Sequence, residues 1–189
     1  MIRPIQATDR FAVAQLLTVI FEDMELTLLT KLSKTEITQM VVEAMADPTY
    51  RYHDARGILI EIDQEVAGVL FGYEAADEKI IDNAWETVAQ QYQLTGDTRL
   101  FKDPEAFPNE WYIDSICVSE KFRGRGLGTQ LLEALYQIAA EKGIETLGLC
   151  CDLSNTRAQS LYERQGFDVV GEQVLSHHRY YHMQKKIRL

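Results

Sequence analysis

The chain has 189 residues and a formal net charge of −10, with 46% hydrophobic and 25% charged residues. This length and composition fit one globular domain with a sizeable core. The acidic charge argues against nucleic-acid binding and favours cationic partners. No apolar run approaches the ~18 residues of a membrane helix, and the N-terminus lacks the apolar stretch of a signal peptide. We therefore expect a cytoplasmic protein without membrane segments, whose three cysteines (Cys117, Cys150 and Cys151) stay reduced in the core.

The first half of the chain has the patterns of two helices and three strands. Asp9 is placed to cap the first helix, whose inward face is expected to include Phe11 and Leu17. Ser33 and Glu36 form a capping-box pattern at the start of the second helix. Two later apolar runs predict an antiparallel hairpin. The expected elements are a strand at 2–5, helices at 10–23 and 33–47, and strands at 57–62 and 66–73.

Residues 74–110 combine a helical pattern with a proline-containing loop. Apolar residues from Ile80 to Tyr92 have helical spacing, and Gly96 ends the helix. The stretch 77–110 holds eight acidic and three basic residues. Two interpretations stay open. The segment lines a binding pocket, as loops on a rigid scaffold often do, or it is a surface elaboration or dimer contact.

The most informative stretch is Arg123-Gly124-Arg125-Gly126-Leu127-Gly128, which joins a strand pattern at 112–118 to a helical pattern that ends at Gly143. The first amides of a helix lack intrahelical acceptors and carry partial positive charge. Glycines let a ligand approach the backbone, and the two arginines suit phosphate oxygens. The turn therefore predicts a pyrophosphate site. The glycine spacing does not match the Rossmann fingerprint, and no Lys follows Gly128 as a phosphate loop requires.

The remaining chain predicts a strand at 146–151, a short helix at 155–164, and strands at 167–170 and 179–183. Three histidines, His177, His178 and His182, fall in the last part. Adjacent histidines point to opposite sides of a strand, and no carboxylate or Cys lies at ligand spacing. We read them as strand or loop residues and expect no metal.

Two linked motifs carry a resemblance to a known family. They are Arg123-x-x-Gly126-x-Gly128, after strand 116–118, and Asn155-x-x-Ala158-x-x-Leu161-Tyr162-x-x-x-Gly166-Phe167. In this order and at this distance they resemble the GNAT family of acyl-CoA-dependent N-acyltransferases, over roughly residues 110–185. The resemblance implies an α/β fold of the α+β type, with a mixed, mostly antiparallel sheet of six or seven strands and helices on both faces. It implies one domain over 1–189, in which 74–110 is a family-atypical helical insertion.

The resemblance also implies acetyl-CoA as co-substrate and assigns residues to it. The pyrophosphate falls on Arg123, Gly124, Arg125, Gly126, Gly128 and Thr129. The pantetheine arm falls on Ile116, Cys117 and Val118, with the Val118 N–H as oxyanion donor, and on Asn155, Ala158 and Tyr162. Asn155 has the donors and the acceptor that pantetheine amides need, although it is equally suited to cap a helix.

Amine acylation needs a proton acceptor for the amine and a proton donor for the departing thiolate. Asp114, Ile116 and Val118 share one face of a strand of period 2, and the family often places a base at the position of Asp114. Glu110 and Tyr112 compete for that role, and Asp114 could instead only bond Ser115, the backbone or solvent. Tyr162 matches the family tyrosine near the thioester sulfur, where a phenol with a pKa near about 10 can donate a proton. Its alternative is core packing.

The implied function is transfer of the acetyl group of acetyl-CoA to a primary amine of a small molecule or peptide, by direct attack through a tetrahedral intermediate. Cys117 adjoins the first motif without a nearby His in sequence, so no covalent relay is expected. Residues 22–25 are either a solvated acidic face or, as in the family's loop between its first two helices, part of the amine entrance. Open alternatives are a protein acceptor docked on the acidic insertion, a non-catalytic acyl-CoA sensor and, more distantly, a dinucleotide oxidoreductase. Since dimers are common in the family, a homodimer is also a candidate.

Overall fold

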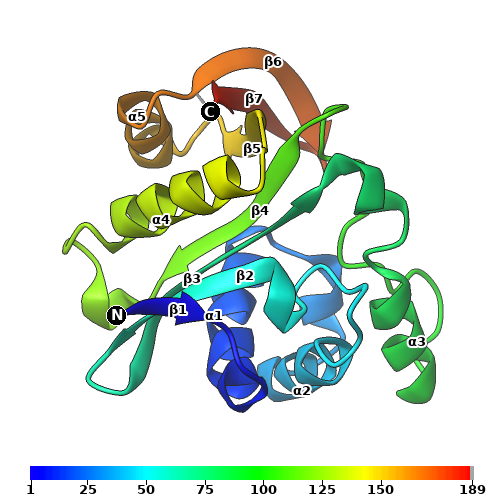
Figure 1. The fold of residues 1–189 in the computed structure, drawn as a ribbon. Coiled ribbons are helices and arrows are strands. Elements are labelled where there is room, and N and C mark those ends of the chain that lie inside the picture. The colour runs from blue at the N-terminus through cyan, green and yellow to red at the C-terminus, as the bar shows by residue number, and fades with distance from the viewer. Residues whose placement is uncertain (188–189) are drawn as a thin grey trace.

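The computed structural model describes residues 1–187, which form one seven-stranded sheet with helices packed against it (Figure 1). The strands are β1 (Ile2–Pro4), β2 (Gly57–Ile62), β3 (Glu65–Glu74), β4 (Trp111–Val118), β5 (Thr146–Asp152), β6 (Asp168–Leu175) and β7 (His178–Lys186). The helices are α1 (Arg10–Asp23), α2 (Lys34–Ala44), α3 (Asn83–Gln91), α4 (Leu127–Glu141) and α5 (Thr156–Arg164). Short 3-10 turns lie at Ala7–Asp9, Thr27–Thr30, Asp54–Arg56, Ala75–Lys79 and Glu120–Phe122. None of the helices within residues 1–187 is long and apolar enough to cross a membrane.

The sheet confirms the expected mixed, mostly antiparallel architecture. Its strand order is β1-β2-β3-β4-β5-β7-β6, and β4 with β5 is its parallel pair. These two strands pair only where Trp111 faces Leu147 and Tyr112 faces Gly148. Beyond Tyr112 the strands part, which opens a gap in the middle of the sheet. By contrast, β3 pairs with β4 from Gly68 to Glu74, with one register shift between Phe71 and Gly72.

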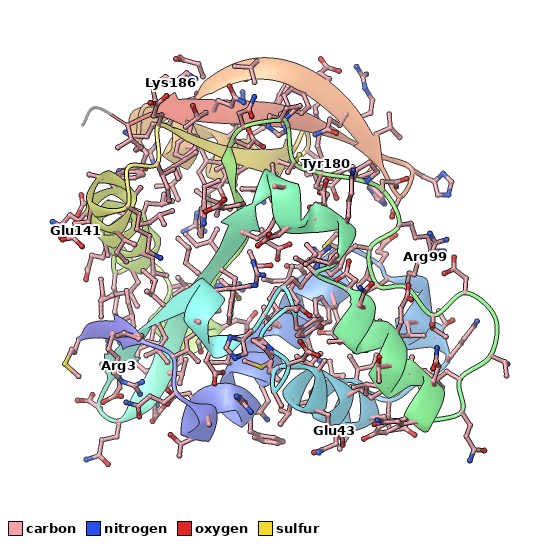
Figure 2. All side chains as sticks on the ribbon, turned by 45° about the vertical axis from the view of Figure 1, so that its right-hand side comes forward. Arg3, Glu43, Arg99, Glu141, Tyr180 and Lys186 are labelled. Carbon is pink, nitrogen blue, oxygen red and sulfur yellow. The ribbon has the colours of Figure 1, made fainter. Side chains whose placement is uncertain are left out.

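Helices cover both faces of the sheet, as expected. One apolar core lies between the sheet and the helices α1, α2 and α3, and a second lies between the other face and the helices α4 and α5. In Figure 1 the two helix layers stand on opposite sides of β3 and β4, and α3 lies beside α2. Charged side chains such as Arg3, Glu43 and Glu141 lie at the periphery (Figure 2). Buried and half-buried residues alternate along most of β4, and the alternation breaks at Tyr112 and Ile113, next to the register shift with β3.

Local sequence signals set several element boundaries. Ser33 accepts a hydrogen bond from the Glu36 N–H while the Glu36 carboxylate accepts one from the Ser33 N–H, which confirms the capping box of α2. Gly126 begins α4 with a left-handed φ of 75°, a conformation that side chains other than glycine adopt at a cost. Asn155 begins α5 by accepting the Ala158 N–H at 3.1 Å.

Three sequence predictions of detail are wrong. Phe11 is 54% exposed, because the inner face of α1 passes through Val13, Ala14 and Leu17 instead. Asp9 makes no cap bond to α1, since Arg3 on β1 draws its carboxylate into an ion pair at 2.7 Å. The helix expected from Ile80 to Gly96 is shorter. It spans only Asn83–Gln91, and it ends early because Gln93 already has a left-handed φ of 55°.

A buried polar cluster joins the start of β4 to β7. The Glu110 side chain is fully buried, and its carboxylate lies 3.0 Å from His182 Nε2. It also accepts hydrogen bonds from Gln184 Nε2 and from the Phe107 N–H, both at 2.7 Å. The Phe107 ring stacks on the His182 imidazole with centroids 3.6 Å apart. These contacts fix the end of the β3–β4 connection (residues 75–110) against the sheet.

Gly148 is the residue that makes room for this cluster, since a Cβ there would overlap the Glu110 carboxylate. We predict that Gly148→Ala lowers the free energy of unfolding by about 1 to 3 kcal/mol, because an added methyl group overpacks a buried site. Urea denaturation measures this change. The control is Gly128→Ala, where the nearest atom lies 3.7 Å away and the helical position tolerates Ala. An equal loss in both variants would contradict the clash.

Candidate functional site

The gap between β4 and β5 holds a cavity of about 540 Å³. Its wall includes five residues that the sequence analysis assigned to the site, which the fold brings together from β4 and α5: Asp114, Ile116, Asn155, Ala158 and Tyr162. Asp23 and Met24 also line it, from the end of α1. The acidic stretch 22–25 therefore reaches the cavity, which is compatible with a place at the amine entrance.

The glycine-rich turn follows β4 and the 3-10 turn Glu120–Phe122, and it leads into α4. Gly124 and Gly126 both have left-handed φ angles, 78° and 75°, and no atom lies within 4 Å of a Cβ built on either. The turn therefore presents open backbone ahead of the free amides of the first helical turn, where Gly128 and Thr129 lie. This geometry fits a diphosphate group, because helix N-termini and left-handed turns bind anions through backbone N–H groups.

Each of the two arginines of this turn contacts neighbouring residues. Arg123 Nε donates to the Val118 carbonyl at 3.2 Å, and its Nη1 lies 3.4 Å from Glu120. The Arg125 guanidinium lies over the Phe122 ring, 5.3 Å from its centroid. Both contacts are partly exposed and weak, so they leave the charges available to an anion.

The two residues of the second motif lie differently in the cavity wall. Asn155 uses its side-chain oxygen to cap α5 and keeps its N–H₂ donors, so capping and ligand binding are compatible. Tyr162 is 8% exposed, and burial raises the pKa of its phenol above the ordinary value. The hydroxyl therefore stays protonated near neutral pH and is a candidate proton donor.

Cys117, beside Ile116 on β4, points to the opposite core. It packs with the α1 side of the sheet, and burial raises the pKa of its thiol to about 11. Any contact of Cys117 with a ligand in the cavity must therefore come from its backbone. The role expected of Val118 is also a backbone role, that of its N–H. The structure leaves these backbone roles as predictions.

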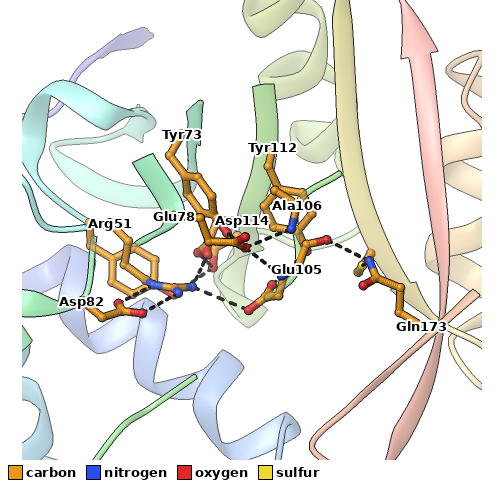
Figure 3. A network of polar contacts seen from close by, with 12 residues as sticks. Arg51, Tyr73, Glu78, Asp82, Glu105, Ala106, Tyr112, Asp114 and Gln173 are labelled. Atoms are coloured by element: carbon orange, nitrogen blue, oxygen red, sulfur yellow. Dashed lines mark hydrogen bonds and ion pairs between the residues drawn. The ribbon is translucent and has the colours of Figure 1, made fainter. Parts of the chain in front are cut away.

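A buried cation, Arg51, occupies the centre of a polar network beside the cavity (Figure 3). Only 2% of Arg51 is exposed. Its guanidinium donates to both oxygens of Asp82 at 2.8 Å and to Asp114 Oδ1 at 2.5 Å. It also stacks on Phe101, 3.8 Å from the ring centroid. Asp114 Oδ2 accepts the Ser115 hydroxyl at 2.8 Å, so both oxygens of the predicted base are already bonded.

A second carboxylate, Glu105 of the β3–β4 connection, also lines the cavity. Its Oε2 accepts the Tyr112 hydroxyl at 2.8 Å, and its Oε1 lies 3.7 Å from Arg51 Nη1. Burial raises the pKa of Glu105 to about 7, and the charge of Arg51 opposes that shift. Burial also holds the pKa of Tyr112 well above its ordinary value, so this phenol remains a donor.

The other polar candidates are less suited to chemistry in the cavity. Glu110 does not line it and is bound to His182. Cys150 does line it and lies 3.5 Å from His182 Nδ1, a pairing the sequence did not reveal. Burial raises the pKa of the Cys150 thiol to about 12, which keeps it protonated and poorly nucleophilic. Among residues 1–187, no group of three or more His, Cys, Asp or Glu is arranged to hold a metal ion.

Sequence reasoning missed Arg51 and did not single out Glu105 within its acidic segment. The available signal for Arg51 was its place between Tyr50 and Tyr52, two aromatic residues of a kind that buries a large area. Glu105 had a weaker signal, a position between Pro104 and Pro108 that restricts the loop. Neither signal identifies the residues that Arg51 and Glu105 contact in the folded chain.

Comparison with known proteins agrees with this geometry. The model of the acetyltransferase (GNAT) family matches residues 26–167, so the chain belongs to the GNAT family. A solved structure described as an acetyltransferase is 44% identical and superposes with a TM-score of 0.89 over 100% of both chains. An N-acetyltransferase from Staphylococcus aureus Mu50 is 30% identical, with a TM-score of 0.87 over 98% of this chain and 100% of that one.

Similarity to curated relatives is more local. An uncharacterized N-acetyltransferase of Bacillus subtilis, YycN, is 32% identical over 83 residues, which cover 44% of this chain and 53% of that protein. The first curated relatives are matched over 19% to 65% of their own length. They support the family and leave the acceptor of this chain open.

The raised pKa of Glu105 predicts a pH dependence of stability. Between the ordinary value of 4.5 and about 7, the folded state keeps a proton that the unfolded state has lost, so wild-type stability falls as pH rises through this window. Gln at this position cannot titrate. We compare the free energy of unfolding of Glu105→Gln with that of wild type. We predict that the variant gains about 3 kcal/mol relative to wild type between about pH 4.5 and about pH 8. Urea titrations at several pH values measure it, and a constant difference would contradict the buried acid.

Proposed function

We propose that this protein transfers the acetyl group of acetyl-CoA to a primary amine. The observation that carries the proposal is the cavity between the parted strands β4 and β5, which gathers Asp114, Asn155 and Tyr162. The family to which the chain belongs supports acyl-CoA as donor. The three cysteines are unpaired, which supports the cytoplasm as the location.

The chain's own residues fit the donor in two places. The open amides after Gly124 and Gly126, with Arg123 and Arg125, would hold the diphosphate. The unpaired edge of β4 beyond Tyr112 and the Asn155 amide would hold the pantetheine arm. Bound acetyl-CoA supplies an activated thioester. The Val118 N–H would stabilise the oxygen of the attacked carbonyl, and the Tyr162 hydroxyl would protonate the departing sulfur.

The acceptor is best matched by a cationic amine of a small molecule or peptide. The cavity wall includes four acidic side chains and, among the described residues, no Lys, Arg or His. The acids are Asp23, Glu105, Asp114 and Asp152. Arg51 balances part of this charge from behind the wall. An ammonium group entering the cavity would therefore be attracted and brought to a site that can accept its proton.

Thiol release from acetyl-CoA tests the proposal, with polyamines, amino sugars, amino acids and short peptides as acceptors. We expect turnover with at least one class of cationic amine and none with neutral alcohols. Activity confined to basic peptides would identify a protein acceptor. Tight CoA binding without thiol release from any amine would contradict the enzyme and favour a sensor.

The Tyr162→Phe variant makes this test residue-specific. It keeps the ring in the core and removes the proton donor, so kcat should fall by about 100-fold or more while the affinity for CoA is retained. The matched control is Tyr136→Phe, whose hydroxyl is buried without a partner and does not line the cavity. Equal kcat values for Tyr162→Phe and wild type would remove Tyr162 from the reaction.

A further inference from the structure

We propose that Glu105, carried by the β3–β4 connection, accepts the proton of the amine in the cavity, with Tyr112 as its positioning residue. This assignment rests on the proposed acetyl transfer and names the group that makes the amine nucleophilic. It places part of the catalytic apparatus on residues 75–110, away from both family motifs.

The geometry gives Glu105 one engaged and one available oxygen. Tyr112 donates its hydroxyl to Oε2 at 2.8 Å. The nearest cationic atom to Oε1 is Arg51 Nη1 at 3.7 Å, which is too long for a hydrogen bond, and no described residue donates a hydrogen bond to Oε1. Since Glu105 lines the cavity, Oε1 can receive a proton from an ammonium group there.

Asp114 lacks such an oxygen. Arg51 and Ser115 each donate to a different oxygen of its carboxylate, at 2.5 and 2.8 Å, and the Asp114 side chain is only 2% exposed. One of these oxygens holds the buried Arg51 guanidinium, and no oxygen of Asp114 is left without a hydrogen bond. The arrangement therefore makes Asp114 the counter-ion of Arg51 and leaves Glu105 free for proton transfer.

Although Glu105 belongs to a loop, its backbone is held from two sides (Figure 3). Glu78 Oε1 accepts the N–H groups of Glu105 and Ala106 at 2.7 and 2.9 Å. The Glu105 carbonyl accepts the Gln173 side-chain amide at 2.8 Å, from β6. These contacts hold the Glu105 backbone in place at the cavity wall, as the positioning of a proton acceptor requires.

The surroundings of Glu105 shift its pKa towards the pH at which a base has to act. Burial raises its pKa to about 7, Arg51 and the Tyr112 hydroxyl lower it, and Asp114 and Glu78 raise it. The other titratable neighbours that feel its charge are Tyr73, Cys150 and Tyr180. A base whose pKa is raised towards neutral pH is well suited to removing a proton there.

The step balances as follows. Glu105 in its carboxylate form takes one proton from R–NH₃⁺, and the neutral amine nitrogen forms the N–C bond to the acetyl carbon. The C–S bond breaks as Tyr162 gives its proton to the sulfur, and the second nitrogen proton restores the Tyr162 phenol. Glu105 then releases its proton to water. The products are R–NH–acetyl, CoA thiol and one proton.

The test is the pH dependence of kcat/KM for the amine, measured at saturating acetyl-CoA with the best acceptor of the thiol-release panel. Wild type should lose activity below a midpoint near pH 7. Glu105→Gln should lower kcat/KM by about 100-fold or more and abolish that midpoint. With an acceptor already neutral at the assay pH, the defect should shrink towards wild type, a result that a merely structural role would not produce. Glu86→Gln, an exposed acid on α3, is the matched control.

Tyr112→Phe provides the second variant. Loss of a donor to the ionised form should raise the Glu105 pKa, so the kinetic midpoint should move to higher pH. A midpoint that stays in place in Tyr112→Phe, or that survives in Glu105→Gln and vanishes in Asp114→Asn, would overturn the assignment. An active wild type with an equally active Glu105→Gln overturns the assignment alone. A wild type that acetylates no amine overturns the proposed function and the assignment together.

Discussion

The buried guanidinium of Arg51 is the group on which the acceptor end of the molecule depends. Burying a cation without partners costs roughly several kcal/mol, so a buried guanidinium needs carboxylates around it. Here the ion-pair partners come from two further parts of the chain, Asp82 and Glu105 from the β3–β4 connection and Asp114 from β4. The loop that carries Arg51, the connection and the strand must therefore be assembled together.

This constraint and the parting of β4 from β5 produce one cavity. The parallel pair ends at Tyr112, and the connection covers the resulting gap with Glu105 and Phe101 while α5 closes it with Tyr162. The Glu110–His182 cluster anchors the connection where β4 begins. One end of the cavity is thus built from family motifs, and the other from residues 75–110. On the proposed function, this division would let the family motifs hold the donor while residues 75–110 select the acceptor.

The sequence predicted the parts of the fold whose causes are local. Gly126 begins α4, Asn155 caps α5 and the Ser33–Glu36 pair caps α2, because each depends on residues a few positions away. The period of β4 also predicted that Asp114 shares the face of Ile116, but the strand bulges here. Ile113 and Ile116, three residues apart, both pack into the α4–α5 core, while Asp114 bonds Arg51. Its partner was not predictable, since Arg51 is 63 residues distant, and Glu110 lies 72 residues from His182. Such pairs depend on strand order and on the path of the connection, which no local pattern records.

Residue-resolved hydrogen exchange of Arg51→Lys against wild type tests the central claim, that Arg51 joins the connection to β4. Lysine keeps the charge and loses the planar fork that binds Asp82 and Asp114 simultaneously. We predict faster exchange of backbone amides at 77–82 and 105–114, with unchanged protection in α4. Unchanged protection at 105–114 would show that the cavity wall is held in place without Arg51.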